Sequence, residues 1–469
     1  MKKIIIALTT NLFRAMKNNK LFLFLFFSSF SVYSLWLFAF FPGIMSFDSV
    51  SQWEQASTKI YNNAHPFLHT LLITLLKSVW DTPAFVALFQ IIISSLIIAY
   101  SLVFFLKLGA SKKKIFIVFF ILLILPSVGI YNITLWKDVL FAQCITALSI
   151  IFIKDFLNQT KITNTKIILV AVLTLLISNM RHNGIIYLPI VPLIYFSFRI
   201  INVKKLALMT ISIIIFYITL NVIVFNVLHV TSTSDSLPRE FVKLQIIGNA
   251  LRMGYAPSKE ESDTIEKLMP LEEFRKRYNC SAIDYLRIDN SPMNEKLFYD
   301  KKFISEFDKI SNAIIMNNLQ FAISDRICLF SSLTGLSNPR WQFLYHNDID
   351  ENIFGIKQSS NNSLRNVLNS YLVWSTKYPQ RFILWSHFFY ILIYIYFFIK
   401  SFYTKNYALL GFIIIITINV PALFIFGIAR DFRYLYMINF ALPFIFLVDD
   451  IGNRKKYWSI SRDYIKSLF

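Results

Sequence analysis

Charged and polar side chains lie beside the long apolar runs of this chain at five places, and these residues are the ones able to do chemistry. A charge at the centre of a bilayer costs roughly 2.5–3.5 kcal/mol, so a charge that abuts an apolar span needs a reason. The five places are Phe41–Ser49 with Asp48, His65-Pro66, Trp136-Lys137-Asp138, Arg181-His182-Asn183-Gly184 and Arg430-Asp431-Phe432-Arg433-Tyr434. Their convergence on one membrane face predicts a functional site there.

Asp48 comes shortly after a Pro42-Gly43 turn and has two interpretations. As an N-cap, its carboxylate would accept a hydrogen bond from the first turn of a helix over Ser49–Ser57, a position that Asp favours. As a general base at the water boundary, the ionised carboxylate would take a proton from an acceptor hydroxyl. The two interpretations are compatible, because a cap residue can still face a cavity. Glu54, the next acid, is explained by a solvated helix face.

Three arginines are candidates for binding phosphate. Arg181 lies at a turn between two apolar stretches, and Arg430 and Arg433 precede the last apolar stretch. Such an arginine can extend to lipid headgroups. Alternatively, its planar guanidinium can bind the oxygens of a phosphate or diphosphate on a lipid-linked substrate. Tyr434 supports this second interpretation only weakly, because tyrosine is common at membrane interfaces.

Lys137 and Asp138 are adjacent at the start of an apolar run. They are interpreted either as a local ion pair, or as a phosphate-binding lysine beside an acid that assists Asp48. His65 and His69 are one helical turn apart, a spacing compatible with a metal. No third ligand is nearby in the sequence, so we assign no metal ligands.

His182 and Asn183 are interpreted as hydrogen-bonding residues that support the site. Other signatures of chemistry are missing from the sequence. It contains no Gly-rich phosphate-binding loop, no Ser/His/Asp signature and no Cys-x-x-Cys motif. An ATP-driven pump is therefore not expected.

The elements that position these residues are membrane helices. Hydrophobic residues make up 56% of the 469 residues and charged residues only 16%, and uncharged windows of 18 or more residues recur along the chain. We therefore predict an all-α polytopic membrane protein with about ten transmembrane helices, the fifth and sixth being two crossings or a re-entrant hairpin. The ten spans are Leu21–Phe41, Ala84–Leu106, Ile115–Leu135, Val139–Ile153, Ile167–Met180, Gly184–Phe198, Leu206–Leu228, Phe382–Ile399, Asn406–Ala429 and Leu435–Val448.

The net charge of +20 reports topology and not nucleic-acid binding. The long polar segment 231–380 holds 18 basic and 18 acidic residues and is neutral. The excess positive charge lies mostly in short loops, which is the pattern of cytoplasmic loops. This places both termini in the cytoplasm and the five charged places outside. We predict a multi-pass protein of a bacterial plasma membrane.

The chain is expected to have three parts. Residues 1–230 form a membrane domain whose first outer loop, 42–83, carries a membrane-surface helix over Pro66–Trp80. Residues 231–380 form a large, mostly helical extracytoplasmic insert. Residues 381–469 form a C-terminal three-helix membrane segment. Cys280 and Cys328 both fall in the insert, and whether they pair is left open.

An inside N-terminus, one span, and then a long outer loop with an early Asp and interfacial helices resemble the GT-C class of membrane glycosyltransferases. That resemblance implies transfer of a sugar from a polyprenyl-phosphate donor to an acceptor at the outer face. It implies that Asp48 is the base and that Arg181, Arg433 and Lys137 bind the donor phosphate. Basic residues would stabilise the charge of the leaving phosphate.

The five motifs over the first 200 residues and near the end also resemble a little-studied bacterial family of GT-C-like proteins. The chain departs from the better-known pattern because no acidic pair stands in its first outer loop, so nothing supports the divalent metal that the class often uses. The expected partners are membrane lipid, a polyprenyl-phosphate sugar, and a glycan or lipid acceptor. Two alternatives stay open: a polysaccharide polymerase or ligase that uses lipid diphosphate, and a lipid or solute transporter.

Overall fold

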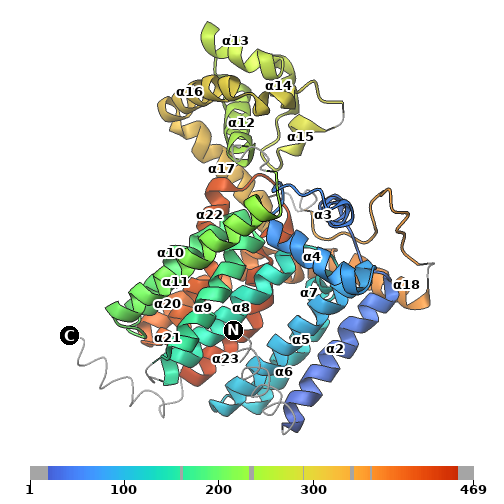
Figure 1. The fold of residues 1–469 in the computed structure, drawn as a ribbon, viewed down its shortest axis with the longest axis vertical. Helices are drawn as coiled ribbons and strands as arrows, with labels where there is room; N and C mark the ends of the chain where they lie inside the picture. The colour runs from blue at the N-terminus through green and yellow to red at the C-terminus, as the bar shows by residue number, and fades with distance from the viewer. Residues whose placement is uncertain are drawn as a thin grey trace.

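The computed structural model describes residues 19–158, 162–231, 237–288, 290–337, 343–359 and 362–452, and this part of the chain is helical apart from isolated β-bridges. Its apolar helices form one bundle, and a smaller group of helices lies beyond one end of the bundle (Figure 1). This agrees with the predicted all-α class.

Six helical segments among the described residues are long and apolar enough to cross a membrane. They are α2 (Lys20–Ala39), α5 (Pro83–Lys107), α8 (Lys137–Asn158), α11 with η2 (Val203–Val222, Ile223–Val227), α21 with α22 (Tyr407–Thr417, Asn419–Phe426) and η5 with α23 (Phe432–Leu435, Tyr436–Gly452). The pair α6 (Lys112–Ile124) and α7 (Pro126–Asn132) makes a seventh if counted as one span bent by 57°. Pro126 begins α7 and explains the bend.

The other three predicted spans fall on shorter helices. These are α9 (Asn164–Met180), η1 with α10 (His182–Ile186, Tyr187–Ser197) and α20 (His387–Tyr403). The number of ten crossings therefore stays a prediction. The described residues form six or seven helical segments that are long and apolar enough to cross a membrane.

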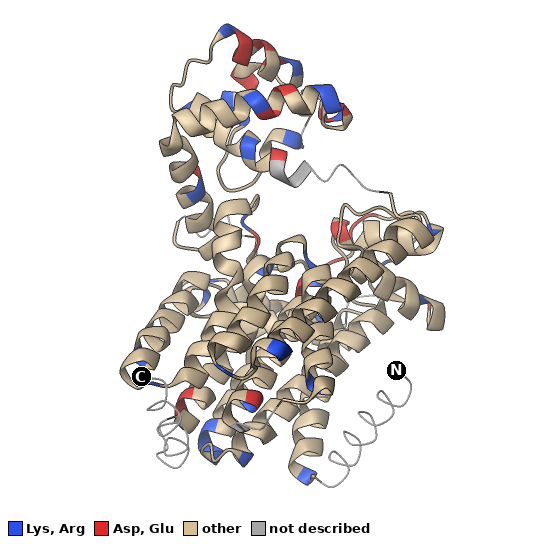
Figure 2. Ribbon diagram, turned by 60° about the vertical axis from the view of Figure 1, so that its left-hand side comes forward, with Lys and Arg blue, Asp and Glu red and all other residues tan. Residues whose placement is uncertain are grey.

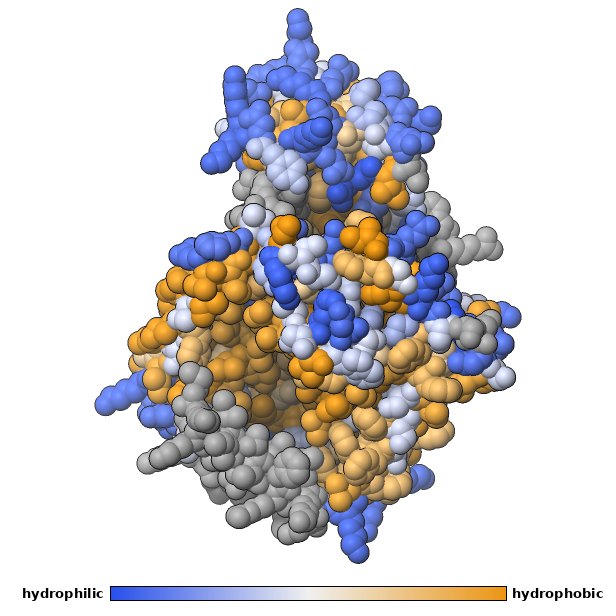
Figure 3. Space-filling view, turned by 45° about the vertical axis from the view of Figure 1, so that its right-hand side comes forward, coloured by the Kyte–Doolittle hydropathy of each residue, from blue (hydrophilic) through white to orange (hydrophobic). Residues whose placement is uncertain are grey.

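Charged residues gather at the two ends of the bundle and leave its middle almost free of them (Figure 2). The face in Figure 3 carries apolar residues over the bundle and hydrophilic ones over the outlying group. At one end of the helices, three ion pairs join neighbouring segments: Lys114–Asp450, Lys166–Asp155 and Lys400–Asp449. An apolar belt between two charged ends is the distribution expected for a bilayer-embedded bundle.

The loop between the first two predicted spans folds into two helices, α3 (Phe47–Thr58) and α4 (Phe67–Val79). The helix predicted over Pro66–Trp80 is thus present. Gln52 joins the two helices through two hydrogen bonds of 3.0 Å. Its Nε2 donates to Thr70 Oγ1, and its Oε1 accepts from His69 Nδ1. His69 therefore contacts Gln52, and it does not share a ligand set with His65.

The outlying group has its own hydrophobic core. Its helices are α12 (Leu237–Arg252), α13 (Lys259–Leu268), α14 (Leu271–Arg277), α15 (Asp284–Arg287), η3 (Glu295–Tyr299) and α16 (Lys301–Asn317). Buried residues such as Leu244, Phe298 and Phe307 form this core. The rest of the predicted insert differs, because Leu333 and Leu372 pack into the core of the bundle. α17 (Leu319–Thr334) connects the two, and α18 (Ser363–Ser375) and α19 (Gln380–Leu384) come after it in the chain.

A buried polar network fixes the end of α7. Gln90 on α5 donates to the backbone carbonyls of Asn132 and Thr134, at 3.2 and 2.9 Å. Gln143 on α8 donates to Ser94 at 2.6 Å, and Ser94 donates to the Asn132 side chain at 2.5 Å. Side-chain amides thus donate to carbonyls next to the helix break, in an apolar setting where an unpaired polar group is costly. The network sets where the next residues, which begin α8, emerge from the bundle.

Candidate active site

Four loops and one segment of the outlying group meet at a single end of the bundle through backbone pairing. The isolated bridges are Ile44 with Thr134, Met45 with Ile349, Phe343 with Asp431, and Ala282 with Ala429. Backbone hydrogen bonds accompany them, for example from Ile44 N–H to Ile133 O at 2.9 Å and from Asp350 N–H to Met45 O at 2.9 Å. We call this set of paired segments, 44–45, 133–135, 282–283, 343–350 and 428–432, the backbone platform.

Asp48 lies in the first turn of α3, next to the platform, and is not the helix cap. Ser46 occupies the cap position, so the prediction that Asp48 caps a helix over Ser49–Ser57 was wrong. Its carboxylate instead faces three nitrogen groups. Oδ2 lies 2.9 Å from Arg433 Nη1 and 3.8 Å from Lys137 Nζ, and Oδ1 lies 3.8 Å from His65 Nε2.

Arg433 bridges two carboxylates with one guanidinium. Besides Asp48, it contacts Asp431 Oδ2 through Nη2 at 2.9 Å and through Nε at 3.1 Å. Its guanidinium lies 4.9 Å from the centroid of the Trp136 ring, and the Trp136 indole donates to Ser46 Oγ at 2.8 Å. The fork geometry of arginine allows this bridging, which a lysine ammonium would not reproduce.

The electrostatic environment keeps Asp48 ionised and His65 neutral. Burial alone would raise the pKa of Asp48, but the charges of Arg433 and Lys137 outweigh it and hold the pKa well below its usual range. Burial, together with the charge of Lys137, lowers the pKa of His65 to about 3. Burial also raises the pKa of Asp431, although Arg433 opposes this. At neutral pH the cluster therefore contains a carboxylate held by cations and a neutral imidazole.

Lys137 and Asp138 enter different ion pairs, so the first of their two interpretations, a local ion pair, was wrong. Lys137 Nζ lies toward Asp48 and 3.2 Å from His65 Nδ1. An ammonium can only donate, which leaves the imidazole proton on Nε2, the nitrogen that faces Asp48. Adjacent residues at a helix start point in different directions, which explains the separation.

Asp138 instead binds Arg181 in a buried ion pair. The two side chains are 1% and 10% exposed. The Arg181 guanidinium also stacks 4.6 Å from the centroid of the Tyr434 ring, and Arg433 lies 5.6 Å from the same centroid. The Tyr434 ring thus contacts two guanidinium groups. Arg181 is next to the Asp48 cluster, and its charge is already matched by a carboxylate.

Arg430 is directed to the outlying group and not toward Asp48. It donates to Ser281 Oγ at 2.5 Å and to the Tyr285 hydroxyl at 2.9 Å. The sequence had suggested that Arg430 shares the phosphate-binding role of Arg433, and this geometry gives it a different set of contacts. Asp284 lies between these two contact residues, and burial raises the pKa of its carboxyl.

His182 and Asn183 lie on η1, beside the cluster. His182 is exposed and lines a pocket together with Asn63, Asn179 and Tyr217. The pocket has a free volume of about 640 Å³, part of it open to solvent, and its lining also includes aliphatic residues such as Leu71, Leu220 and Val224. Its lining includes Pro66 and His182, the neighbours of His65 and Arg181, so it adjoins the charged cluster.

The arrangement can bind an anion and supply a carboxylate beside it. Among the described residues, no group of three or more His, Cys, Asp or Glu side chains could hold a metal ion. The Arg433 guanidinium occupies the position between Asp48 and Asp431.

No family model, curated protein sequence or solved structure matches this chain. The resemblance to GT-C enzymes therefore rests on the sequence motifs alone. The contacts between the side chains of the Asp48 cluster do not depend on that resemblance.

Sequence reasoning placed Asp48, His65, Lys137 and Arg433 together, and the structure brings these four into contact. It missed the role of Asp431, although the acid stands inside a motif that the sequence had singled out. It also missed Ser281 and Tyr285, for which no sequence signal exists, because an insert of this length can fold back anywhere on this end of the bundle.

Proposed function

We propose that this protein transfers a sugar from a polyprenyl-phosphate donor to a cell-envelope glycan or lipid acceptor at the outer face of a bacterial plasma membrane. The observation that carries the proposal is the contact of one ionised carboxylate, Asp48, with Arg433 and Lys137. Such a cluster offers both groups that the reaction needs, namely cations for the phosphate and a carboxylate for the acceptor.

Donor binding would change the state of Asp48. A phosphate that enters the cluster competes with the Asp48 carboxylate for the Arg433 fork and the Lys137 ammonium. As these cations turn to the phosphate, the pKa of Asp48 rises from its depressed value, because the cations are what hold it down. Asp48 then becomes a stronger base toward an acceptor hydroxyl. The site would be activated by its own donor.

The pocket beside the cluster suits the part of a lipid donor next to its phosphate. Its lining combines neutral hydrogen-bonding side chains, including Asn63 and Asn179, with aliphatic ones. α11 contributes Leu220 to this lining and has a broad exposed apolar face that includes Ile214 and Ile218. A lipid could reach the pocket from the bilayer along this face.

Two observations support an outer location for the cluster. Cys280 of the outlying group and Cys328 of α17 form a disulfide, and disulfides persist in oxidising compartments. The basic loops lie at the opposite end, as cytoplasmic loops do. Both termini, which are predicted to be cytoplasmic, lie outside the described residues.

The test compares envelope glycans from a deletion strain complemented with wild type, Asp48→Asn or Glu54→Gln. Glu54 is the matched control, an exposed acid on the same helix. We expect mass spectrometry to show loss of one glycan modification in Asp48→Asn and in the deletion, and its retention in Glu54→Gln. A glycan profile that is unchanged in the deletion strain would sink the proposal. A polymerase or ligase that relies on arginines alone would keep its product in Asp48→Asn.

A further inference from the structure

The outlying group contacts the loop that carries Arg433 at four consecutive residues. This loop, 427–433, follows α22 and includes the first two residues of η5. Arg326 on α17 donates to Gly427 O at 2.6 Å, and Gln245 on α12 donates to Ile428 O at 3.2 Å. Ile283 N–H also donates to Ile428 O, at 2.9 Å. Two helices and the segment at Ile283 thus bind the carbonyls of the loop.

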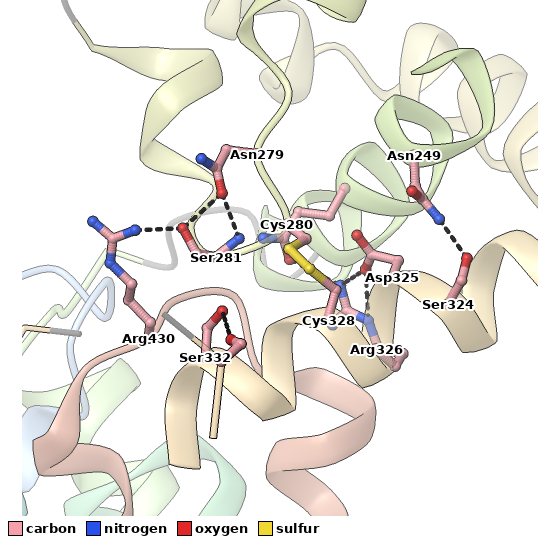
Figure 4. The surroundings of a disulfide bond; sticks show 12 residues. Asn249, Asn279, Cys280, Ser281, Ser324, Asp325, Arg326, Cys328, Ser332 and Arg430 are labelled. Atoms are coloured by element: carbon pink, nitrogen blue, oxygen red, sulfur yellow. Dashed lines mark hydrogen bonds and ion pairs between the residues drawn. A yellow bond between two sulfur atoms is a disulfide. The ribbon is translucent and has the colours of Figure 1, made fainter. Parts of the chain in front are cut away.

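The contacts continue along the loop toward the cluster. Ala282 bridges Ala429, and Ser281 accepts a hydrogen bond from the Arg430 guanidinium. The Asn279 side chain in turn accepts from both N–H and Oγ of Ser281, at 2.9 and 2.7 Å. Figure 4 shows these side chains between Arg430 and the disulfide. Three residues further on, Arg433 reaches Asp48.

The Cys280–Cys328 disulfide ties this contact segment to α17. On the neighbouring turn of α17 lies the buried ion pair Asp325–Arg326 (Figure 4). Arg326 also donates to Gln245 Oε1 at 2.9 Å. Tyr278 donates its hydroxyl proton to Asp325 from the segment that precedes Cys280. One covalent bond and one buried polar cluster therefore hold the segment 278–285 and α17 as a unit.

We propose that the disulfide-linked segment 280–285, with Arg326, is a positioning element for Arg433. It fixes the backbone of loop 427–433 from the outer side, so that the guanidinium stands between Asp48 and Asp431. The hydrogen bonds described above join these residues to the loop and none of them contacts the Arg433 side chain. They therefore act on Arg433 through the backbone of the loop. This inference rests on the proposed function for its effect on activity, but not for its effect on the loop.

Hydrogen–deuterium exchange of the purified full-length protein tests the coupling directly. Two variants release the segment: Cys280→Ala/Cys328→Ala, and the milder Ser281→Ala/Tyr285→Phe. The control is Lys309→Ala, which breaks the exposed ion pair Lys309–Glu260 on α16 and α13. We expect faster exchange in peptides covering 428–435 in both release variants, with the bundle helices unchanged. Exchange at 428–435 that stays at the wild-type rate in both would overturn the proposal.

Product formation supplies the second readout. A displacement of about 1 Å at a catalytic group can cost on the order of 100-fold in rate, so we expect a loss of that order in both release variants and none in Lys309→Ala. Faster exchange with full product, in a strain background where Asp48→Asn loses product, would also overturn the positioning role. If Asp48→Asn keeps its product, the proposed function fails, and the exchange data alone decide whether the segment positions the loop.

Discussion

The buried pair Arg181–Asp138 gives the sharpest test of which arginine binds substrate. Arg181→Met removes the cation and leaves the Asp138 carboxylate, 1% exposed, without its counter-ion. Its second oxygen, Oδ2, already has no hydrogen-bond partner among the described residues. Removing one partner of a buried pair costs about 3–5 kcal/mol, because an unpaired charge stays behind. Total stabilities are about 5–15 kcal/mol, so this loss is large.

The double variant Arg181→Met/Asp138→Leu removes both charges and should behave differently. Replacing a buried pair by apolar residues of similar volume is often neutral, within about 1 kcal/mol, or stabilising. We therefore expect a strongly lowered melting temperature for Arg181→Met and a value close to wild type for the double variant. Intrinsic tryptophan fluorescence of detergent-solubilised protein, with size-exclusion recovery after heating, measures both.

The same pair of variants separates two roles for Arg181. If Arg181 serves to balance Asp138, the double variant should also keep most of the transferase product. If Arg181 binds the donor phosphate, the double variant should fold and yet lose the product. Equal destabilisation in the single and the double variant would refute the reasoning, because it would mean that the lost stability does not come from the unpaired carboxylate.

Three further variants at or near the site have expected outcomes. His65 has a pKa of about 3 in the folded protein and about 6.5 in the unfolded chain, so the free energy of unfolding should fall as the pH drops below 6.5, by about 2 kcal/mol at pH 5. The melting temperature of His65→Gln should therefore change less between pH 7.5 and pH 5 than that of the wild type. An equal change in the two proteins would contradict this reasoning. Gly184→Ala should lower the melting temperature, with a loss of about 1–3 kcal/mol in the free energy of unfolding, because a Cβ would lie 2.5 Å from Ile177 O. Ile185→Ala, at the exposed neighbouring residue, is the control, and an equal loss in both variants would exclude the steric cause. Arg433→Lys keeps the positive charge but not the planar guanidinium, so the amount of product should fall about 10²–10³-fold, while size-exclusion chromatography shows an intact fold. A wild-type amount of product would show that bridging of the two carboxylates is not needed.

The helices of the bundle were predictable because their signal is local. The span expected over Leu21–Phe41 is observed as Lys20–Ala39, and the surface helix expected over Pro66–Trp80 as Phe67–Val79. Long uncharged runs and helical spacing depend only on neighbouring residues. The short spans were less certain for the same reason, since α9 and α20 have 17 residues each and length alone does not decide whether they cross.

The pairing within the site was only partly predictable. Topology brought Asp48, Lys137 and Arg433 to one face, because each adjoins an apolar span. Topology does not say which acid meets which base. A local ion pair with Lys137 was one of the two interpretations of Asp138, and yet this residue binds Arg181, which lies 43 residues away in the sequence. Such choices depend on the angle between helices and on backbone pairing between distant loops, and neither leaves a pattern in the sequence.

The backbone platform has a consequence for how proteins of this kind diverge. Its segments are joined by N–H and C=O groups, which every residue except proline supplies in full. Most side chains along these loops can therefore be exchanged without loss of the joint, whereas the contact between Asp48 and Arg433 depends on the two side chains themselves. Two chains could share this fold and chemistry while agreeing at only a handful of positions scattered along their length. Relatives of this protein are best sought by the spatial arrangement of that handful, and overall sequence identity is a poor guide to them.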